Sequence, residues 1–342
     1  MKVVVCKAWG PPESLVIEDR PPLEAGPGKV VVSVKAASVK FSDTLIIQNK
    51  YQTKPELPFI PGSEVTGVVK AIGAGVEGWK VGDRVSAQTT YGGYAEEVIA
   101  DPDRLAALPE SIEFASATGL SSTYGTSYYA LTDRGQLRAG ETLLVLGASG
   151  GVGLAAVEIG KVLGAKVIAC ASNEEKLAVC RAHGADETIN YVSEDMRARV
   201  KAITKGNGVD VICDPVGGPY SELALRDMAW GGRLLVIGFT AGDIPKIPLN
   251  LPLIKGCSIV GVWIGAFAKR DPARHRANAV ELWKWFAEGK IKPHIWATYP
   301  LEKAADALNA LAGRKVAGKV VLTTEGQIGT HTFSEGWNVV HP

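Results

Sequence analysis

A glycine-rich turn near the middle of the chain constrains the fold more than any other feature of this sequence. The apolar run 143–146 is followed by the turn GASGGVG at 147–153, and the residues after it predict an apolar helix over 151–163. A second apolar strand is predicted over 166–171, so strand, turn, helix and strand occur in order within about thirty residues. This order is typical of a fold that binds a dinucleotide at the turn.

Two glycines of the turn have separate predicted roles. Gly150 lets the main chain approach a pyrophosphate, and Gly153 lets the helix lie close to the sheet. The helix N-terminus offers free N–H groups to the anion. A glycine turn can also be purely structural, but the surrounding strands and helix favour a cofactor turn from Ala148 to Gly153.

The end of the second strand predicts which dinucleotide binds. Forms of this fold that bind NAD carry an acidic residue there, about twenty positions after the last glycine, to hold the ribose 2′-hydroxyl. Ser172 stands at that place, and Lys176 follows one helical turn later. A small hydroxyl and a cation suit a 2′-phosphate, which favours NADPH over NADH. The alternative is that Lys176 is an exposed helix lysine paired with a neighbouring glutamate.

The rest of the chain divides into a β-rich part and an alternating part. The length of 342 residues suggests two domains, and the first third alternates short Val-rich runs, such as 29–34 and 64–72, with Gly and Pro. From about residue 115, strands and helices alternate, which predicts a parallel α/β sheet. The predicted strands after the turn are 209–214, 233–238 and 258–262, and the predicted helices are 174–183 and 221–230.

The C-terminal part predicts two amphipathic helices, 272–288 and 301–311, and a last strand, 318–323. We expect a substrate domain over 1–125, completed by 268–342, and a cofactor domain over 126–267. Residues beyond Glu325 show no clear period and are expected to be loosely held or to cover a surface.

Composition excludes several classes of protein. Lys and Arg total 37 against 36 Asp and Glu, so no excess of positive charge is available for nucleic acid or an anionic membrane. No apolar run reaches the roughly 20 residues of a membrane span, and the N-terminus lacks a signal peptide, so we expect a soluble, cytoplasmic protein. The five cysteines are odd in number and scattered, which favours buried thiols over disulfides or metal ligands.

A set of short motifs in fixed order identifies a family. The motifs are Asp43 with Tyr51, the run LPFIPG at 57–62, GSE at 62–64, GDRV at 82–85, GGYAE at 92–96, the glycine turn, INY at 189–191 and GKV at 318–320. Across about residues 1–324 the chain resembles the medium-chain dehydrogenase/reductase superfamily, and within it the zinc-free NADPH:quinone oxidoreductase group related to zeta-crystallin. The resemblance implies an α/β protein with a GroES-like β-rich substrate domain and a Rossmann domain with a doubly wound parallel sheet.

The same resemblance argues against a metal. Zinc enzymes of the superfamily carry ligands at the positions that look like Lys40, Ser63 and Ser122, and none of these residues suits zinc. The four-cysteine lobe of those enzymes is also absent, because 93–109 contains no cysteine. Without a Lewis acid, alcohol oxidation is not expected.

The resemblance also implies which residues lie along the cofactor and how the chain assembles. The implied cofactor residues are Thr126, Ser149, Gly150, Gly151, Val152, Gly153, Ser172, Lys176 and Tyr191, with Gly238, Phe239, Trp263, Ile264 and Lys319 nearer the nicotinamide or phosphate ends. Trp263 and Phe239 are also consistent with core aromatic residues near a subunit contact. By analogy, the apolar strand 258–265 suits pairing with a second copy in a homodimer.

The expected reaction is hydride delivery from NADPH to a quinone or an α,β-unsaturated carbonyl compound. Such a site must bind the nicotinamide in a largely apolar cleft and stabilise the carbonyl oxygen that gains charge. Tyr51 is the favoured donor, and Tyr94 is a second tyrosine in the first domain. Lys40 stands where the family usually has Asn, so it either anchors the carbonyl, supplies a proton or reaches solvent. All five histidines lie outside the first-domain motifs.

Two other functions stay open. An enoyl-thioester reductase on the same scaffold would need basic residues for the coenzyme phosphates, and Lys50 and Lys54 leave that possible. A crystallin-like protein that binds NADPH without turnover would be indicated by damage to the cofactor turn, but Gly150, Gly153 and Lys176 are all present.

Overall fold

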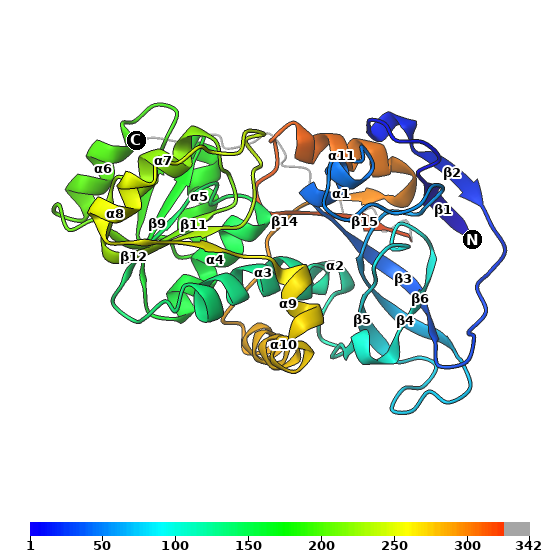
Figure 1. The fold of residues 1–342 in the computed structure, drawn as a ribbon. Coiled ribbons are helices and arrows are strands. Elements are labelled where there is room, and N and C mark those ends of the chain that lie inside the picture. The colour runs from blue at the N-terminus through cyan, green and yellow to red at the C-terminus, as the bar shows by residue number, and fades with distance from the viewer. Residues whose placement is uncertain (325–342) are drawn as a thin grey trace, which may run out of the picture. The chain divides into compact units, whose positions relative to one another are not determined.

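The computed structural model describes residues 1–324, and these residues divide into two units. The first unit holds 1–115 and 295–313 together with the strand that ends at 323, and the second holds 116–294 and 314–319. Figure 1 shows both units.

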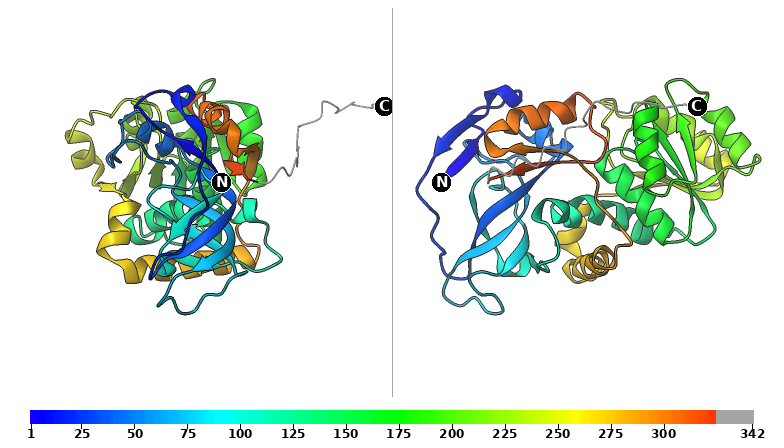
Figure 2. Two further views of the ribbon diagram at one scale, coloured as in Figure 1. Left: turned by 90° about the vertical axis from the view of Figure 1, so that its right-hand side faces the viewer. Right: turned by 180° about the vertical axis from the view of Figure 1, so that it is seen from behind.

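The first unit is built on a seven-stranded sheet whose paired strands are antiparallel wherever a register is defined. The strand order is β14-β15-β3-β4-β5-β7, and β6 pairs with β3. Figure 2 draws the strands of this unit in two further views. The strands of this sheet are β3 (Val30–Val39), β4 (Glu64–Ile72), β5 (Arg84–Gln88), β6 (Glu97–Ala100), β7 (Leu105–Ala107), β14 (Ile295–Pro300) and β15 (Lys319–Thr323).

Short elements complete the first unit. A separate two-stranded ribbon pairs β1 (Lys2–Val5) with β2 (Val16–Asp19) in antiparallel fashion. The helices are short, and only α11 exceeds two turns among them. They are η1 (Pro12–Ser14), α1 (Phe41–Ile46), η2 (Pro102–Arg104), η5 (Leu301–Lys303) and α11 (Ala304–Ala312), with α2 (Phe114–Ala117) at the boundary between the units.

The second unit contains a six-stranded sheet in which every paired strand is parallel. The strand order is β10-β9-β8-β11-β12-β13, which is the doubly wound order of dinucleotide-binding folds. The strands are β8 (Thr142–Val145), β9 (Lys166–Ala171), β10 (Glu187–Asn190), β11 (Val209–Asp214), β12 (Met228–Val236) and β13 (Ser258–Gly261). The helical elements are η3 (Leu120–Tyr124), α3 (Gly125–Tyr128), η4 (Tyr129–Arg134), α4 (Gly151–Val162), α5 (Glu174–Ala182), α6 (Met196–Ile203), α7 (Pro219–Leu225), α8 (Asn250–Lys255), α9 (Ile264–Arg270) and α10 (Pro272–Ala287).

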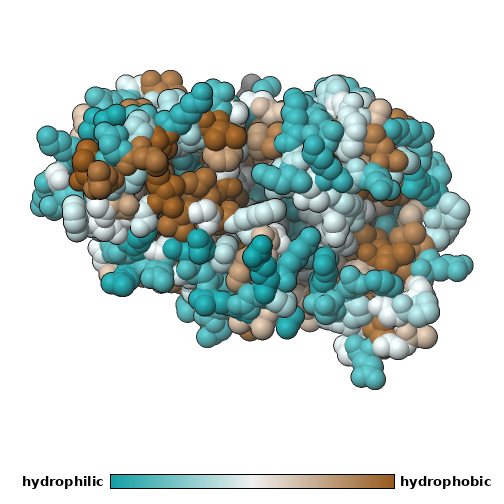
Figure 3. Space-filling view, viewed as in Figure 1, coloured by the Kyte–Doolittle hydropathy of each residue, from teal (hydrophilic) through white to brown (hydrophobic). Residues whose placement is uncertain are grey.

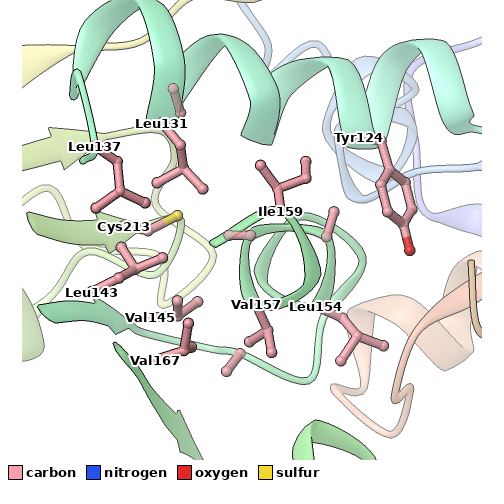
Figure 4. Packing of buried hydrophobic residues seen from close by; sticks show 14 of the residues in the cluster. Tyr124, Leu131, Leu137, Leu143, Val145, Leu154, Val157, Ile159, Val167 and Cys213 are labelled. Atoms are coloured by element: carbon pink, nitrogen blue, oxygen red, sulfur yellow. The ribbon is translucent and has the colours of Figure 1, made fainter. Parts of the chain in front are cut away.

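Alternate residues of the parallel strands supply two separate cores, one on each face of the sheet. On β8, Leu143 and Val145 belong to the core that contains α4, while Leu144 belongs to the opposite core. Figure 4 shows the first of these cores, where strand side chains meet α4 through Leu154, Val157 and Ile159. This packing explains why the strands are apolar at nearly every position, as expected for a sheet that is covered on both faces.

The structure confirms the predicted fold class and several element bounds. The strands predicted over 64–72, 166–171 and 209–214 are β4, β9 and β11. The predicted helix over 221–230 is wrong in its second half, because α7 ends at Leu225 and the chain then enters β12 beside β11. The short helix α9 is an element that the sequence analysis did not predict.

The division into units differs from the predicted domain bounds in three places. The first unit ends at residue 115 rather than 125, and residues 268–294 and 314–319 lie in the second unit rather than completing the first. For 268–294 the reason is the packing of α10, whose Leu282 and Trp285 are buried in the core that contains α4. The Trp285 ring lies 5.3 Å from the ring of Tyr128, centroid to centroid.

Membrane-spanning helices and disulfides were both unexpected from the sequence. Within 1–324, no helix is both long enough and apolar enough to span a bilayer. All five cysteines are free thiols, and four of them are buried. The expectation for the segment beyond Glu325 lies outside the described residues.

Candidate functional site

The second unit has one point where the strand order reverses. The chain runs outward from β8 to β9 and β10, and it then returns to place β11 on the other side of β8. In open α/β sheets, ligands bind outside the carboxyl ends of the strands at such a point. The glycine turn follows β8 there, and Asp214 ends β11 beside it.

The glycine turn has the geometry that the sequence predicts. Gly150 is extended, with φ −73° and ψ 167°, and it begins α4 by accepting a hydrogen bond of 2.7 Å from the Leu154 N–H. A Cβ at Gly153 would collide with the Gly147 oxygen and lie 2.7 Å from the Ala148 Cα. A Cβ at Gly150 would meet only the Gly147 oxygen, at 3.4 Å. Gly153 is therefore required by packing, whereas the space at Gly150 is open to a ligand.

Neighbouring segments hold the turn in place through its main chain. The Ser149 carbonyl accepts a 2.7 Å hydrogen bond from the Gly318 N–H, and the Val152 carbonyl accepts one of 2.7 Å from the Ser127 hydroxyl. Thr126 lies next to Ser127 on α3, where its hydroxyl donates to the Ser122 carbonyl. The predicted residues Thr126, Ser149, Gly151, Val152 and Lys319 thus gather at one place, with the Lys319 side chain close to Gly151.

The predicted 2′-phosphate residues also meet. The Lys176 ammonium lies 3.4 Å from the Ser172 hydroxyl and donates a 2.6 Å hydrogen bond to the Arg314 carbonyl. Burial lowers the pKa of Lys176, and the charge of Arg314 adds to this shift, while Glu175 opposes it. Lys176 therefore places a cation at the carboxyl end of β9, with the charge of Arg314 close enough to act on it. Positive charge of this kind would be neutralised by a bound phosphate.

Arg314 is a residue that the sequence analysis missed. It adopts a left-handed conformation with φ 55°, and its guanidinium donates to the carbonyls of Thr240 and Ala241, each at 3.1 Å. It reaches Lys176 from 138 positions away along the chain. No local pattern signals such a residue, because only the return of the C-terminal segment brings it to β9.

Tyr191 completes this corner of the sheet. It follows β10, and its N–H donates to the Ala171 carbonyl at the end of β9. Its ring lies 4.6 Å from the ring of Tyr220, and burial, reinforced by Tyr220, raises the pKa of Tyr191 to about 12. The Tyr191 hydroxyl is therefore a donor at neutral pH.

The remaining predicted cofactor residues lie after the next two strands. Gly238 and Phe239 follow β12, and the Phe239 ring lies against Gly217 in the loop after β11. Trp263 and Ile264 follow β13, where Trp263 precedes α9 and is 59% exposed. All four therefore stand beyond the carboxyl ends of their strands, on the edge that holds the glycine turn. Trp263 is therefore not buried within the single chain.

The first unit gathers the predicted catalytic residues around a buried carboxylate. Lys40 begins α1, and its ammonium donates a hydrogen bond to the Ser63 hydroxyl. Asp43, one turn into α1, accepts hydrogen bonds from the Lys40 N–H at 2.9 Å and from the Tyr94 hydroxyl at 2.8 Å. These contacts join segments 23 and 51 positions apart along the chain.

Burial dominates the electrostatics of this cluster. It raises the pKa of Asp43, and the nearby charge of Lys40 offsets part of that shift. Burial also raises the pKa of Tyr51, and the negative charge of Asp43 adds to the effect. Tyr94 is fully buried and its pKa is raised well above 10 for the same two reasons. The Tyr51 hydroxyl therefore stays protonated at neutral pH and can donate a hydrogen bond.

The residues present do not fit a catalytic zinc ion. Among the residues that the structure describes, no cluster of three or more His, Cys, Asp or Glu side chains could hold a metal. The Lys40 ammonium donates a hydrogen bond to the Ser63 hydroxyl, and neither an ammonium nor a serine hydroxyl is a usual zinc ligand.

Comparisons with known proteins agree with the two-unit fold described above. Residues 26–110 match the family model of the alcohol dehydrogenase GroES-like domain, and residues 151–284 match that of the zinc-binding dehydrogenase. A quinone oxidoreductase-like protein 2 homolog from Nematostella vectensis is 40% identical over 328 residues, which cover 95% of this chain and 89% of the relative.

Solved structures give the same result. A probable oxidoreductase from Mycobacterium abscessus is 40% identical with a TM-score of 0.85, and the match covers 94% of this chain and 99% of that one. The Escherichia coli quinone oxidoreductase complexed with NADPH is 30% identical with a TM-score of 0.86, covering 94% and 100%.

A GroES-like domain joined to a doubly wound Rossmann domain defines an oxidoreductase of the medium-chain dehydrogenase/reductase superfamily. Within that superfamily the chain belongs to the quinone oxidoreductase family.

Proposed function

We propose that the protein uses NADPH, without zinc, to reduce quinones or α,β-unsaturated carbonyl compounds. The observation that carries this proposal is the Lys40 ammonium hydrogen-bonded to Ser63, beside the buried Asp43. A cation at this place can bind a carbonyl oxygen electrostatically, and it offers no coordination sphere for a metal.

The choice of NADPH rests on the charges at the end of β9. Ser172 and Lys176 offer a hydroxyl and a cation to a 2′-phosphate, and the charge of Arg314 is near enough to act on Lys176. No carboxylate takes the place of Ser172 to hold a 2′-hydroxyl. The glycine turn and the N-terminus of α4 would hold the pyrophosphate. The NADPH named for the Escherichia coli relative agrees with this assignment.

NADPH, when bound, supplies the hydride. The residues of this chain then stabilise the substrate oxygen as it gains negative charge. Lys40 donates from its ammonium and Tyr51 from a hydroxyl whose raised pKa keeps it protonated. A conjugated carbonyl needs only this degree of activation, because conjugation already makes it electrophilic.

A substrate panel tests the proposed reaction. Purified protein is assayed with NADPH and a quinone, an enone, an enoyl-coenzyme A thioester and, in the reverse direction, a primary alcohol with NADP. We expect turnover of the quinone and the enone and no measurable rate with the alcohol. Exclusive turnover of the thioester would favour the enoyl-thioester reductase, and inertness toward every acceptor with NADPH bound would favour the non-catalytic protein.

Elemental analysis of the same preparation tests metal independence. We expect active protein without stoichiometric zinc, because the Lys40 and Ser63 side chains offer no ligand set. One tightly bound zinc per chain, with activity lost when it is removed, would contradict the proposal.

We also propose a homodimer that forms at the outer edge of β13. This strand ends the parallel sheet, and Ile259 on it is 40% exposed. Figure 3 shows apolar side chains gathered over the region where Figure 1 labels α8 and β12. The exposed apolar residues of β12, α8 and the segment between them include Trp230, Ile244, Leu249, Leu253 and Ile254. Such a patch is typical of an interface, and a second copy offers a complementary strand edge.

Sedimentation of Ile259→Lys tests this assembly. We expect wild-type protein to sediment as a dimer and the variant as a monomer, because a charge on the edge strand opposes pairing. Val81→Lys, which changes an exposed apolar residue of the first unit, should leave the dimer intact. A monomeric wild-type protein would contradict the proposal.

A further inference from the structure

A buried acidic residue in the second unit has no part in the proposed reaction. Glu158 lies on α4 and is only 6% exposed. One of its carboxylate oxygens accepts a 2.7 Å hydrogen bond from the Tyr124 hydroxyl, and the other lies 2.6 Å from His183 Nδ1. The Lys292 N–H also donates to the carboxylate, at 3.1 and 3.2 Å. Glu158 therefore ties three distant segments to the helix that begins at the glycine turn.

Glu158, Tyr124 and His183 form a buried cluster, and a second histidine, His294, lies between this cluster and the glycine turn. The His294 ring lies 5.3 Å from the His183 ring in an edge-to-face arrangement. The His294 carbonyl accepts a 2.9 Å hydrogen bond from the Lys319 N–H. These contacts connect the buried Glu158 and its two histidine neighbours to Gly318 and Lys319, and the Gly318 N–H donates to the glycine turn at Ser149.

Gly318 connects His294 to the pyrophosphate turn. Its backbone is in the left-handed region with φ 103°, and a Cβ there would lie 2.5 Å from the His294 oxygen and 2.7 Å from the His294 Cδ2. The Gly318 N–H donates the 2.7 Å hydrogen bond to the Ser149 carbonyl, and Gly318 also forms a β-bridge with Gly150. Gly318 is therefore packed between the His294 side chain and the main chain that would bind the pyrophosphate.

We propose that His294 is a positioning residue for the pyrophosphate turn, and that its protonation weakens dinucleotide binding by releasing Gly318. This inference rests on the proposed dinucleotide site at 148–153. It adds a pH dependence that neither the glycine turn nor the 2′-phosphate residues would produce.

The electrostatics of the cluster give the sign of the effect. Burial lowers the pKa of His294 from its ordinary value of 6.5, and the neighbouring His183 lowers it further, while Glu158 raises it. His294 is therefore neutral near pH 7 in its packed position. Acid adds a proton that this half-buried site disfavours, so the imidazolium gains by moving toward water. The Gly318 packing is then lost, and the turn is held less firmly.

Proton binding by His294 and dinucleotide binding affect each other reciprocally. If the neutral form of His294 binds the dinucleotide better, the bound dinucleotide must lower the pKa of His294 further. A residue with a merely structural role would show neither effect.

The test measures ADP-ribose affinity by calorimetry between about pH 5 and pH 8, where a histidine titrates. ADP-ribose carries the pyrophosphate but lacks the 2′-phosphate, whose own titration would obscure the result. We expect affinity to fall on the order of tenfold on the acid side, with a midpoint below pH 6.5.

Two variants sharpen the test. His294→Gln should bind with nearly constant affinity across the range, because it removes the titrating ring. His183→Gln should move the midpoint to higher pH, because it removes the neighbour that lowers the His294 pKa and leaves Glu158, which raises that pKa, without its histidine partner. NMR of labelled histidine in the wild-type protein should show the His294 pKa falling when ADP-ribose is added.

Several outcomes of these measurements would contradict the proposed role of His294. Affinity that is independent of pH, or that rises in acid, would overturn the role of His294 alone. The same would follow if His294→Gln kept the wild-type profile. If ADP-ribose failed to bind at every pH, the proposed dinucleotide site and this inference would both be wrong.

Discussion

The two units build their sites from different parts of the chain. In the second unit, the glycine turn and the N-terminus of α4 present main-chain groups, and Gly153 is fixed by contact with Gly147 and Ala148. In the first unit, the site consists of side chains, with Lys40 and Tyr94 held by the buried carboxylate of Asp43. Once the required glycines are present, main-chain groups offer the same hydrogen-bonding chemistry whatever the other residues are, whereas each side chain gives its site a particular chemistry.

This difference predicts how each site responds to change. A turn made of main-chain groups should bind dinucleotides in any protein that keeps its glycines. A site made of side chains can exchange a metal ligand for a lysine and thereby exchange one reaction for another. Substitutions in the first unit should therefore alter turnover, and substitutions in the second should alter cofactor affinity.

The largest expected effect is on turnover, from Tyr51→Phe. The change removes a hydroxyl that the raised pKa keeps protonated, so the developing charge on the carbonyl oxygen loses a donor. We expect the rate with a quinone or enone to fall at least about 100-fold and at most about 10,000-fold, which is the usual span for one acid-base group. Steady-state kinetics with saturating NADPH measure it.

Tyr299→Phe is the matched control in the first unit, because Tyr299 lies on β14 and should keep the wild-type rate. NADPH affinity should be unchanged in both variants, since neither tyrosine belongs to the second unit. A wild-type rate in Tyr51→Phe would show that Tyr51 only lines the site.

The same contrast explains what could be predicted from the sequence. The glycine turn, its two flanking strands and Ser172 with Lys176 follow local spacing, and the structure brings these residues together as expected. The domain bounds are harder to predict from sequence. The local pattern of α10 shows an amphipathic helix but does not show that Leu282 and Trp285 pack in the core with α4. The second half of the predicted helix over 221–230 failed because strand pairing with β11 outweighs local helical pattern.

Side-chain partners from distant segments could not be predicted in this way. Lys40 and Tyr51 are visible as candidates, but the sequence does not show that Ser63 accepts from Lys40 or that Asp43 holds Tyr94. Arg314 reaches Lys176 only because the C-terminal segment returns to the second unit. Their catalytic and binding roles stay predictions, as does the cytoplasmic location.

The second effect is on the glycine turn, from Gly153→Ala. The added methyl group would collide with the Gly147 oxygen and the Ala148 Cα, and main-chain atoms cannot move aside without changing the turn. We expect NADPH and NADH affinity to fall alike, about 150-fold, for a distortion that costs about 3 kcal/mol. Fluorescence titration with both cofactors measures it.

Gly151→Ala is the control for Gly153→Ala. A Cβ there would meet the Thr123 methyl group at 3.2 Å and no other atom within 3.5 Å, so the neighbour has only to shift slightly. We expect a smaller loss of affinity. Equal losses for the two variants would show that the packing of α4 does not determine the turn.

The smallest effect separates the two cofactors, and it comes from Lys176→Ala. The ammonium lies beside Ser172 and the Arg314 carbonyl, where it would meet a 2′-phosphate. A charge-assisted contact of this kind contributes about 1 to 3 kcal/mol, so NADPH affinity should fall roughly 5- to 150-fold. NADH affinity should stay nearly unchanged, because NADH lacks that phosphate. Lys166→Ala is the matched control, since Lys166 is an exposed lysine at the opposite end of β9. If wild-type protein bound NADH and NADPH equally well, the charges at this corner would belong to the surface of the protein and not to its cofactor site.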